Sequence, residues 1–162
     1  MTSVRVAWKL ASVGNWLEAE IRRVGRRLHD RQVARIFRIP DDTISAEQTP
    51  CDFFGYTPTA RTILIECKTT EEGRLPLGKN GLKGHQKRAL DELNRANGIS
   101  LLAWGRYANS AVPQIALLDP DMIRVFSEGR RSVPWRRIPP THVFFVHELE
   151  QALELIISPG TL

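Results

Sequence analysis

The apolar residues of this chain recur with two different periods. Between residues 15 and 30 they fall every three to four positions, which places them on one face of a helix with 3.6 residues per turn. These residues are Leu17, Ile21, Val24 and Leu28. We expect a second helix from His85 to Asn97, because Gly98 follows at the usual C-terminal position. A third helix is expected over residues 147–157, and a short helical turn over residues 119–126.

Short runs rich in β-branched and aromatic residues predict strands instead. The runs cover residues 34–39, 51–56, 61–68, 99–104, 113–118 and 142–146. The second and third runs flank the turn-forming segment from Thr57 to Ala60, which predicts a β-hairpin. Polar or glycine-rich segments over 40–50, 71–84 and 127–140 are expected to be loops. The order of elements predicts a mixed α/β domain without internal repeats.

The composition is that of a folded chain. Of 162 residues, 42% are hydrophobic and 25% are charged, so neither disorder nor a fibrous repeat is indicated. The length suits one domain with its own core. No apolar run approaches the ~18 residues of a membrane-spanning helix, and no signal peptide is recognised. With only Cys51 and Cys67, a disulfide framework is excluded, and we expect a cytoplasmic protein in a bacterial, archaeal or phage-infected cell.

Positive charge is concentrated near the beginning of the sequence. The chain carries 23 Lys and Arg against 18 Asp and Glu, a net charge of +5. Residues 1–38 hold nine basic and three acidic residues, so this segment carries +6 and residues 39–162 carry −1. Such a distribution is typical of a polyanion-binding surface, and equally of a solvated basic helix face.

Two acidic residues of the predicted hairpin are the strongest candidates for chemistry. A hairpin symmetric about Thr59 places Asp52 directly opposite Glu66 on the same face, with their Cβ atoms about 5 Å apart. Two carboxylates at that distance repel each other unless a cation lies between them, and oxygen ligands favour Mg²⁺ or Mn²⁺ over Zn²⁺. Cys51 and Cys67 are expected on the opposite face of the hairpin, as small buried hydrophobes.

Lys68 lies on the same strand face as Glu66, because side chains alternate along a strand. Its ammonium group is suited to orienting a water or to meeting negative charge that develops on a phosphate. The interpretation is metal-assisted attack of water on a phosphodiester. An exposed cross-strand ion pair is the other interpretation of these residues, and composition alone makes a Glu-X-Lys triplet common.

Two further polar residues each have two interpretations. Gln86 shares a helix face with Leu90 and Leu93, so it points inward and needs a polar partner, or it remains in water near the start of the helix. Glu18 lies three residues after Asn15, the spacing of a capping box, and it is also a candidate fifth member of the site.

The ordered set of motifs resembles the PD-(D/E)XK nuclease superfamily, and more narrowly the Holliday junction resolvases of the RecU and archaeal types. The resemblance spans about residues 14–125. Its motifs are Gly14–Glu18 (GNWLE), Thr49–Gly55 (TPCDFFG), Ile65–Thr70 (IECKTT), Leu75–Leu77 (LPL), His85–Gln86 (HQ) and Gly98–Ser100 (GIS). RecU-type enzymes carry a longer insertion before the aspartate, so the short segment 39–50 is nearer the archaeal form.

The resemblance implies a restriction-endonuclease-like core, a Mg²⁺ site in which Mn²⁺ can substitute, and a homodimer that acts on branched double-stranded DNA. The implied metal ligands are Glu18, Asp52, Glu66 and the backbone carbonyl of Cys67, and the implied catalytic residues are Glu18, Asp52, Glu66, Lys68 and Gln86. Glu20 is the alternative to Glu18. Recognition of the four-way junction by its shape also follows from the resemblance.

The sequence therefore predicts one nuclease domain over residues 1–162, with a core at about 14–126 and a C-terminal basic loop, strand and helix over 127–162. Its predicted activity is endonucleolytic cleavage of four-way DNA junctions. The expected contacts to DNA phosphates are Arg22, Arg23, Arg26, Lys79, Lys83, Arg130 and Arg131. A nicking or restriction-type nuclease and a non-catalytic DNA-binding module are the alternatives.

Overall fold

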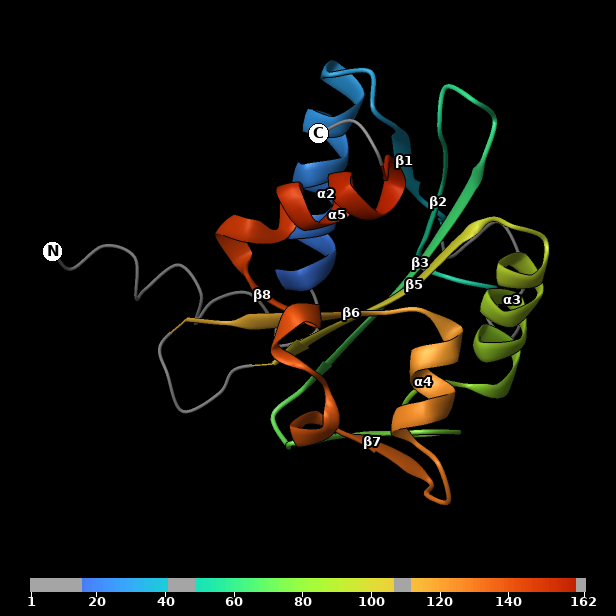
Figure 1. Ribbon diagram of the computed structural model, residues 1–162, viewed down its shortest axis with the longest axis vertical. Coiled ribbons are helices and arrows are strands. Elements are labelled where there is room, and N and C mark those ends of the chain that lie inside the picture. Colours follow the sequence, from blue (N-terminus) through green and yellow to red (C-terminus); the bar gives the residue numbers. More distant parts are fainter. Residues whose placement is uncertain (1–15, 41–48, 107–111, 160–162) are drawn as a thin grey trace, which may run out of the picture.

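The computed structural model describes residues 16–40, 49–106 and 112–159. Within these residues, helices cover both faces of a six-stranded sheet with the strand order β1-β2-β3-β5-β6-β8 (Figure 1). The strands are β1 (Arg35–Arg38), β2 (Phe53–Tyr56), β3 (Thr62–Thr70), β5 (Ile99–Arg106), β6 (Gln114–Leu118) and β8 (Val143–Phe145). The helices are α2 (Trp16–Asp30), α3 (Gly84–Arg95), α4 (Pro120–Phe126) and α5 (Leu149–Ile157).

The predicted β2/β3 hairpin has the predicted register. Phe53 pairs with Ile65 and Tyr56 pairs with Thr62, so the hairpin is centred on Thr59. Strand β3 then pairs in parallel with β5, and α3 forms the connection between them. Regular pairing between β2 and β3 ends at Phe53, whereas β3 continues to Thr70 alongside β5 alone. The two strands therefore separate just before the predicted acidic residues.

The apolar face predicted for the first helix is confirmed, because Leu17, Ile21, Val24 and Leu28 of α2 are all fully buried. This face lies on one side of the sheet, where it shares a core with α5 and with sheet residues such as Ile65 of β3. The core on the other side lies beneath α3 and α4. No helix within the described ranges is long and apolar enough to cross a membrane.

The sequence predicted that the glycine-rich segment 71–84 and the basic segment 127–140 are loops. The structure corrects this in part. These segments contribute β4 (Arg74–Pro76) and β7 (Ser132–Pro134), which pair antiparallel in a second sheet of two strands. Each strand has three residues and only one buried apolar side chain, so neither shows a recognisable hydrophobic period. Segment 127–140 also holds the 3₁₀ turn Trp135–Arg137.

The two cysteines do not face each other, which corrects the prediction from the hairpin pattern. Cys51 is buried on the α3 and α4 side of the sheet, and Cys67 packs against the core on the α2 side. Regular pairing ends at Phe53, so the chain before it no longer follows the alternation of a flat hairpin. The part of the segment 39–50 that distinguishes RecU-type from archaeal enzymes, residues 41–48, lies outside the described residues.

Gly105 of β5 allows α2 to pack closely on the sheet. A Cβ at this position would lie 2.5 Å from Cζ2 of Trp16 and 3.3 Å from Cδ2 of Leu17. We expect Gly105→Ala to lower the free energy of unfolding by about 1–3 kcal/mol, because it overpacks the helix–sheet interface. Urea denaturation followed by circular dichroism measures this change.

Gly84→Ala is the matched control, because its Cβ would meet only Nη1 of Arg88, at 3.9 Å. This control is expected to be neutral or stabilising by less than about 1 kcal/mol. Equal stability of the two variants would show that α2 does not need the space above Gly105.

Candidate active site

The candidate acids lie where β2 and β3 separate. Asp52 precedes β2, and its Oδ2 accepts a hydrogen bond of 2.7 Å from the backbone N–H of Cys67. The carboxylate of Asp52 is therefore fixed against the edge of β3 that β2 leaves unpaired. It is close enough to Glu66 for the charge of one to act on the other, as the predicted hairpin register requires.

Glu66 is fully buried, with 0% of its surface exposed. Its Oε1 lies 2.6 Å from Nζ of Lys68, whose side chain is 21% exposed. The ammonium group of Lys68 and the backbone N–H of Asp52 both act on this carboxylate and lower its pKa. The Glu66–Lys68 ion pair therefore joins a buried carboxylate to an ammonium group that reaches the surface.

Burial shifts the ionisation of both acids. It is the main cause that raises the pKa of Glu66 to about 7, and the nearby charge of Asp52 raises it further, against the opposing effect of Lys68. Burial also raises the pKa of Asp52, although the hydrogen bond from Cys67 opposes this shift. Two ionised carboxylates are thus costly at this place, and a bound cation would relieve that cost.

The backbone adds one more oxygen. The N–H and C=O of a strand residue point to the same edge, so the carbonyl of Cys67 is directed to the edge where its N–H meets Asp52. In the parts of the chain that the structure describes, no three His, Cys, Asp or Glu side chains gather closely enough to hold a metal ion. Two carboxylates and a carbonyl nevertheless suit Mg²⁺, which usually binds one or two carboxylates and retains several waters.

Glu18 approaches the site from α2, but its carboxylate is paired. Oε2 accepts a hydrogen bond of 2.9 Å from Nε of Arg38 on β1. The charge of Glu18 still raises the pKa of Asp52, whereas Glu20 forms an ion pair of 2.8 Å with Arg23. Electrostatic proximity therefore favours Glu18 over Glu20. Asn15, the predicted capping partner of Glu18, lies outside the described residues.

Gln86 is buried at the start of α3, as its position on the helix predicts, with 8% of its surface exposed. Its Oε1 accepts a hydrogen bond of 3.0 Å from the backbone N–H of Lys83, so it caps the helix. No polar contact joins Gln86 to Asp52 or Glu66 among the described side chains. Its role in the active site stays a prediction.

Arg38 is a member of this neighbourhood that the sequence analysis missed. It lies opposite Phe53 in the β1/β2 register, next to Asp52, and its charge lowers the pKa of that carboxyl. The β1/β2 pairing carries the signal that would have identified it, because that register places Arg38 beside the aspartate.

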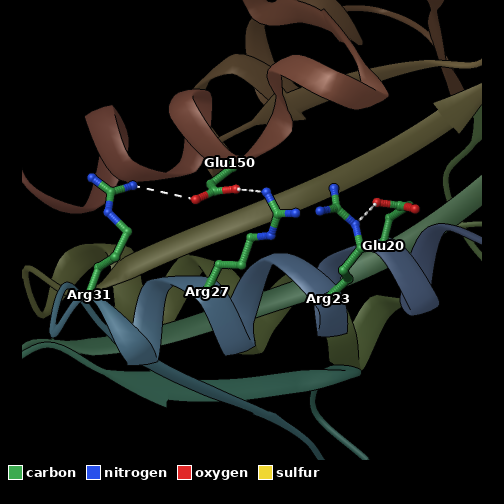
Figure 2. A network of polar contacts seen from close by, with 5 residues as sticks. All are labelled: Glu20, Arg23, Arg27, Arg31 and Glu150. Atoms are coloured by element: carbon green, nitrogen blue, oxygen red, sulfur yellow. Dashed lines mark hydrogen bonds and ion pairs between the residues drawn. The ribbon is translucent and has the colours of Figure 1, made fainter.

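Two arginines of α2 form ion pairs with α5, which the charge distribution along the sequence did not predict. Figure 2 shows Arg27 and Arg31 pointing toward Glu150 of α5, with N–O distances of 3.0 and 3.4 Å. Arg31 also lies 2.7 Å from Glu154. The acidic residues of α5 thus offset part of the basic excess of residues 1–38.

The predicted DNA contacts on α2 differ in their surroundings. Arg23 is held by Glu20, whereas Arg22 and Arg26 are exposed. The other four predicted contacts, Lys79, Lys83, Arg130 and Arg131, are also exposed, and they lie outside the six-stranded sheet.

The fold is the mixed-sheet α/β domain that the sequence predicts, with an antiparallel β1-β2-β3 unit, a connecting helix, and a strand parallel to β3. Among solved structures, the chain is similar to Hjc of Archaeoglobus fulgidus, a Holliday junction resolvase from an archaeal hyperthermophile. The match has 16% sequence identity and a TM-score of 0.48, and it covers 82% of this chain and 98% of that chain. No protein-family model and no curated protein matches this chain.

The raised pKa of Glu66 predicts how the stability of the metal-free protein depends on pH. A carboxyl whose pKa rises from 4.5 to about 7 on folding stabilises the protein below pH 4.5, and this contribution is lost as pH rises through 7. We expect the free energy of unfolding in EDTA to fall between pH 5 and 8, by up to about 3 kcal/mol. Urea denaturation at several pH values measures this slope.

Glu66→Gln is expected to flatten the slope, because the variant has no carboxyl to ionise at this position. An unchanged slope in this variant would show that other groups cause the pH dependence.

Proposed function

We propose that this protein is a Mg²⁺-dependent endodeoxyribonuclease that resolves four-way DNA junctions by paired cuts. The observation that supports this proposal is the position of Asp52, Glu66 and Lys68 at the point where β2 and β3 separate. There two carboxylates with raised pKa values adjoin an ammonium group that reaches the surface. Oxygen ligands beside a cationic side chain suit hydrolysis of a phosphodiester.

Asp52, Glu66 and the carbonyl of Cys67 would hold the divalent ion, which supplies charge neutralisation at the phosphate and a more acidic water. Asp52 uses one carboxylate oxygen to bind the N–H of Cys67, and the other is available to a ligand. Lys68 orients the attacking water or stabilises the charge that develops on the phosphate. Glu18 adds negative charge near Asp52, and Gln86 assists from α3.

The choice of a four-way junction and of a homodimer rests on the motif resemblance. A two-fold dimer presents two equivalent sites, and resolution of a junction requires two cuts in opposite strands. Contacts to backbone phosphates through exposed arginines and lysines would make binding salt-dependent and largely independent of sequence.

Replacement of Lys68 tests the proposed mechanism. We expect Lys68→Ala to lower cleavage of a synthetic immobile four-way junction in Mg²⁺ by at least about 10²–10³-fold, because it removes a charge at the reacting phosphate. Junction affinity should change by less than about twofold. Lys87→Ala is the control, because Lys87 pairs with Asp91 on α3 at 3.0 Å and lies outside the proposed site.

The same assay separates the candidate activities when matched linear duplex, Mn²⁺ and a chelator are included. Paired nicks in the junction alone, abolished by chelator, support the proposal. Equal cutting of linear duplex would indicate a nicking or restriction-type nuclease. Tight binding without cutting in either metal would indicate a DNA-binding module, and loss of binding by a folded Lys68→Ala variant would make Lys68 a docking residue.

Glu18 and Glu20 are distinguished by a matched pair of substitutions. We expect Glu18→Gln to reduce the cleavage rate by about tenfold or more and to raise the Mg²⁺ concentration needed for half-maximal rate, because its charge acts on Asp52. Glu20→Gln should leave both quantities within about twofold. A larger effect of Glu20→Gln would assign the helix carboxylate of the site to Glu20.

A further inference from the structure

The small sheet of β4 and β7 forms one wall of a basic groove. The groove has a volume of about 600 Å³. Its lining includes Glu72, Arg74, Arg130, Ser132, Pro134 and Arg136. Arg74 and Arg136 were not among the DNA contacts expected from the sequence.

The pairing of the two strands determines which side chains face this groove. Leu75 and Val133 pair with each other and are buried in the core beneath α3 and α4. Because side chains alternate along a strand, the neighbouring residues on each strand face outward. Arg74 therefore lies beside its partner Pro134, on the solvent side of the sheet.

The charge of the groove is strongly positive. Three arginines line it with a single acid, Glu72, which pairs with Arg74 at 3.1 Å through side chains that are both about two-thirds exposed. An exposed pair of this kind contributes little and exchanges readily for another partner. Among the described ion pairs, none involves Arg130 or Arg136. Arginine's planar fork of N–H donors matches the oxygens of a phosphate.

Arg106 and Trp135 contact each other next to Gly73 and Arg136, which line the groove. The guanidinium carbon of Arg106 lies 5.6 Å from the ring centroid of Trp135, whose ring packs edge-on against Trp104 at 4.8 Å. The Arg106 guanidinium also lies beside the backbone of Gly73. These contacts position Trp135 and therefore the adjacent Arg136.

The groove follows the active-site strand directly. Arg74 is the first groove arginine after Lys68, six residues further on, and six residues of extended chain span at most about 20 Å. Successive nucleotides of one strand in duplex DNA are separated by about 3.4 Å along the axis. A phosphate bound at Arg74 would therefore lie within about six nucleotides of a phosphate at Lys68.

We propose that this groove binds the DNA backbone within about six nucleotides of the scissile phosphate, on one side of the cut. The inference rests on the proposed function, because that function defines the scissile position. It adds Arg74 and Arg136 to the DNA-binding surface and gives the contact a direction, from Lys68 along β3 toward β4 and β7.

The test compares two triple variants that remove the same charge. Arg74→Gln, Arg130→Gln and Arg136→Gln together neutralise the groove. Arg35→Gln, Arg61→Gln and Arg95→Gln together neutralise exposed arginines at the opposite end of β3 and its neighbours. Affinity for a fluorescent four-way junction is measured in EDTA at several salt concentrations, and cleavage is measured separately in Mg²⁺.

The groove variant should bind about tenfold or more weakly, and its slope of log K against log salt should be shallower by about 2–3. The control variant should stay within about twofold of wild type. Neutral methylphosphonates placed one at a time in the junction should weaken wild-type binding within about six nucleotides on one side of the cut. They should have little effect at those positions on the groove variant.

Equal losses in both triple variants, or no loss in the groove variant, would overturn the inference. Displacement of the junction by polyglutamate as effectively as by unlabelled DNA of equal charge would also overturn it, in favour of an acidic protein ligand. If the wild-type protein does not cut the junction, but junction affinity falls in the groove variant and not in the control variant, the groove binds DNA and the proposed activity is wrong. If the groove variant cuts the junction normally and binds it with unchanged affinity, the proposed activity stands and the inference about the groove is wrong.

Discussion

The hydrogen bond from the backbone N–H of Cys67 to Asp52 determines the geometry of the candidate site. Strand β3 continues after β2 has left it, so its next outward N–H lacks a strand partner. A buried N–H without a partner is costly, and the carboxylate of Asp52 takes the place of the missing carbonyl. The same hydrogen bond holds the carboxylate of Asp52 at Cys67, the residue that follows Glu66. A requirement of the sheet thus places a charged side chain where the proposed chemistry needs it.

This arrangement opposes local stability. Glu66 is surrounded by protein, and both it and Asp52 are protonated more readily than ordinary carboxyls. Lys68 compensates Glu66 directly, and Arg38 lowers the pKa of Asp52 from the other side. Such a cluster is poorly explained by packing alone, whereas a site that binds a cation and a phosphate accounts for it.

The sequence predicted what depends on nearby residues. The helical face of α2 follows from its period, and the β2/β3 register follows from a turn centred on Thr59. It did not predict the β4/β7 sheet, whose strands are too short to show a pattern, or the separation of Cys51 from Cys67. The partners of Arg27 and Arg31 also escaped prediction, because Glu150 lies more than a hundred positions away.

One face of the central sheet is covered by helices from both ends of the described chain, α2 and α5. During synthesis, α2 and the strands of the hairpin leave the ribosome long before residues 149–157 do. The apolar face of α2 that packs with α5 therefore remains partly unprotected until residues 149–157 have been synthesised. Contacts between such distant segments slow folding, and exposed apolar surface in a partly made chain promotes aggregation. Completion of this core by α5 is thus expected to make the nascent chain less prone to self-association.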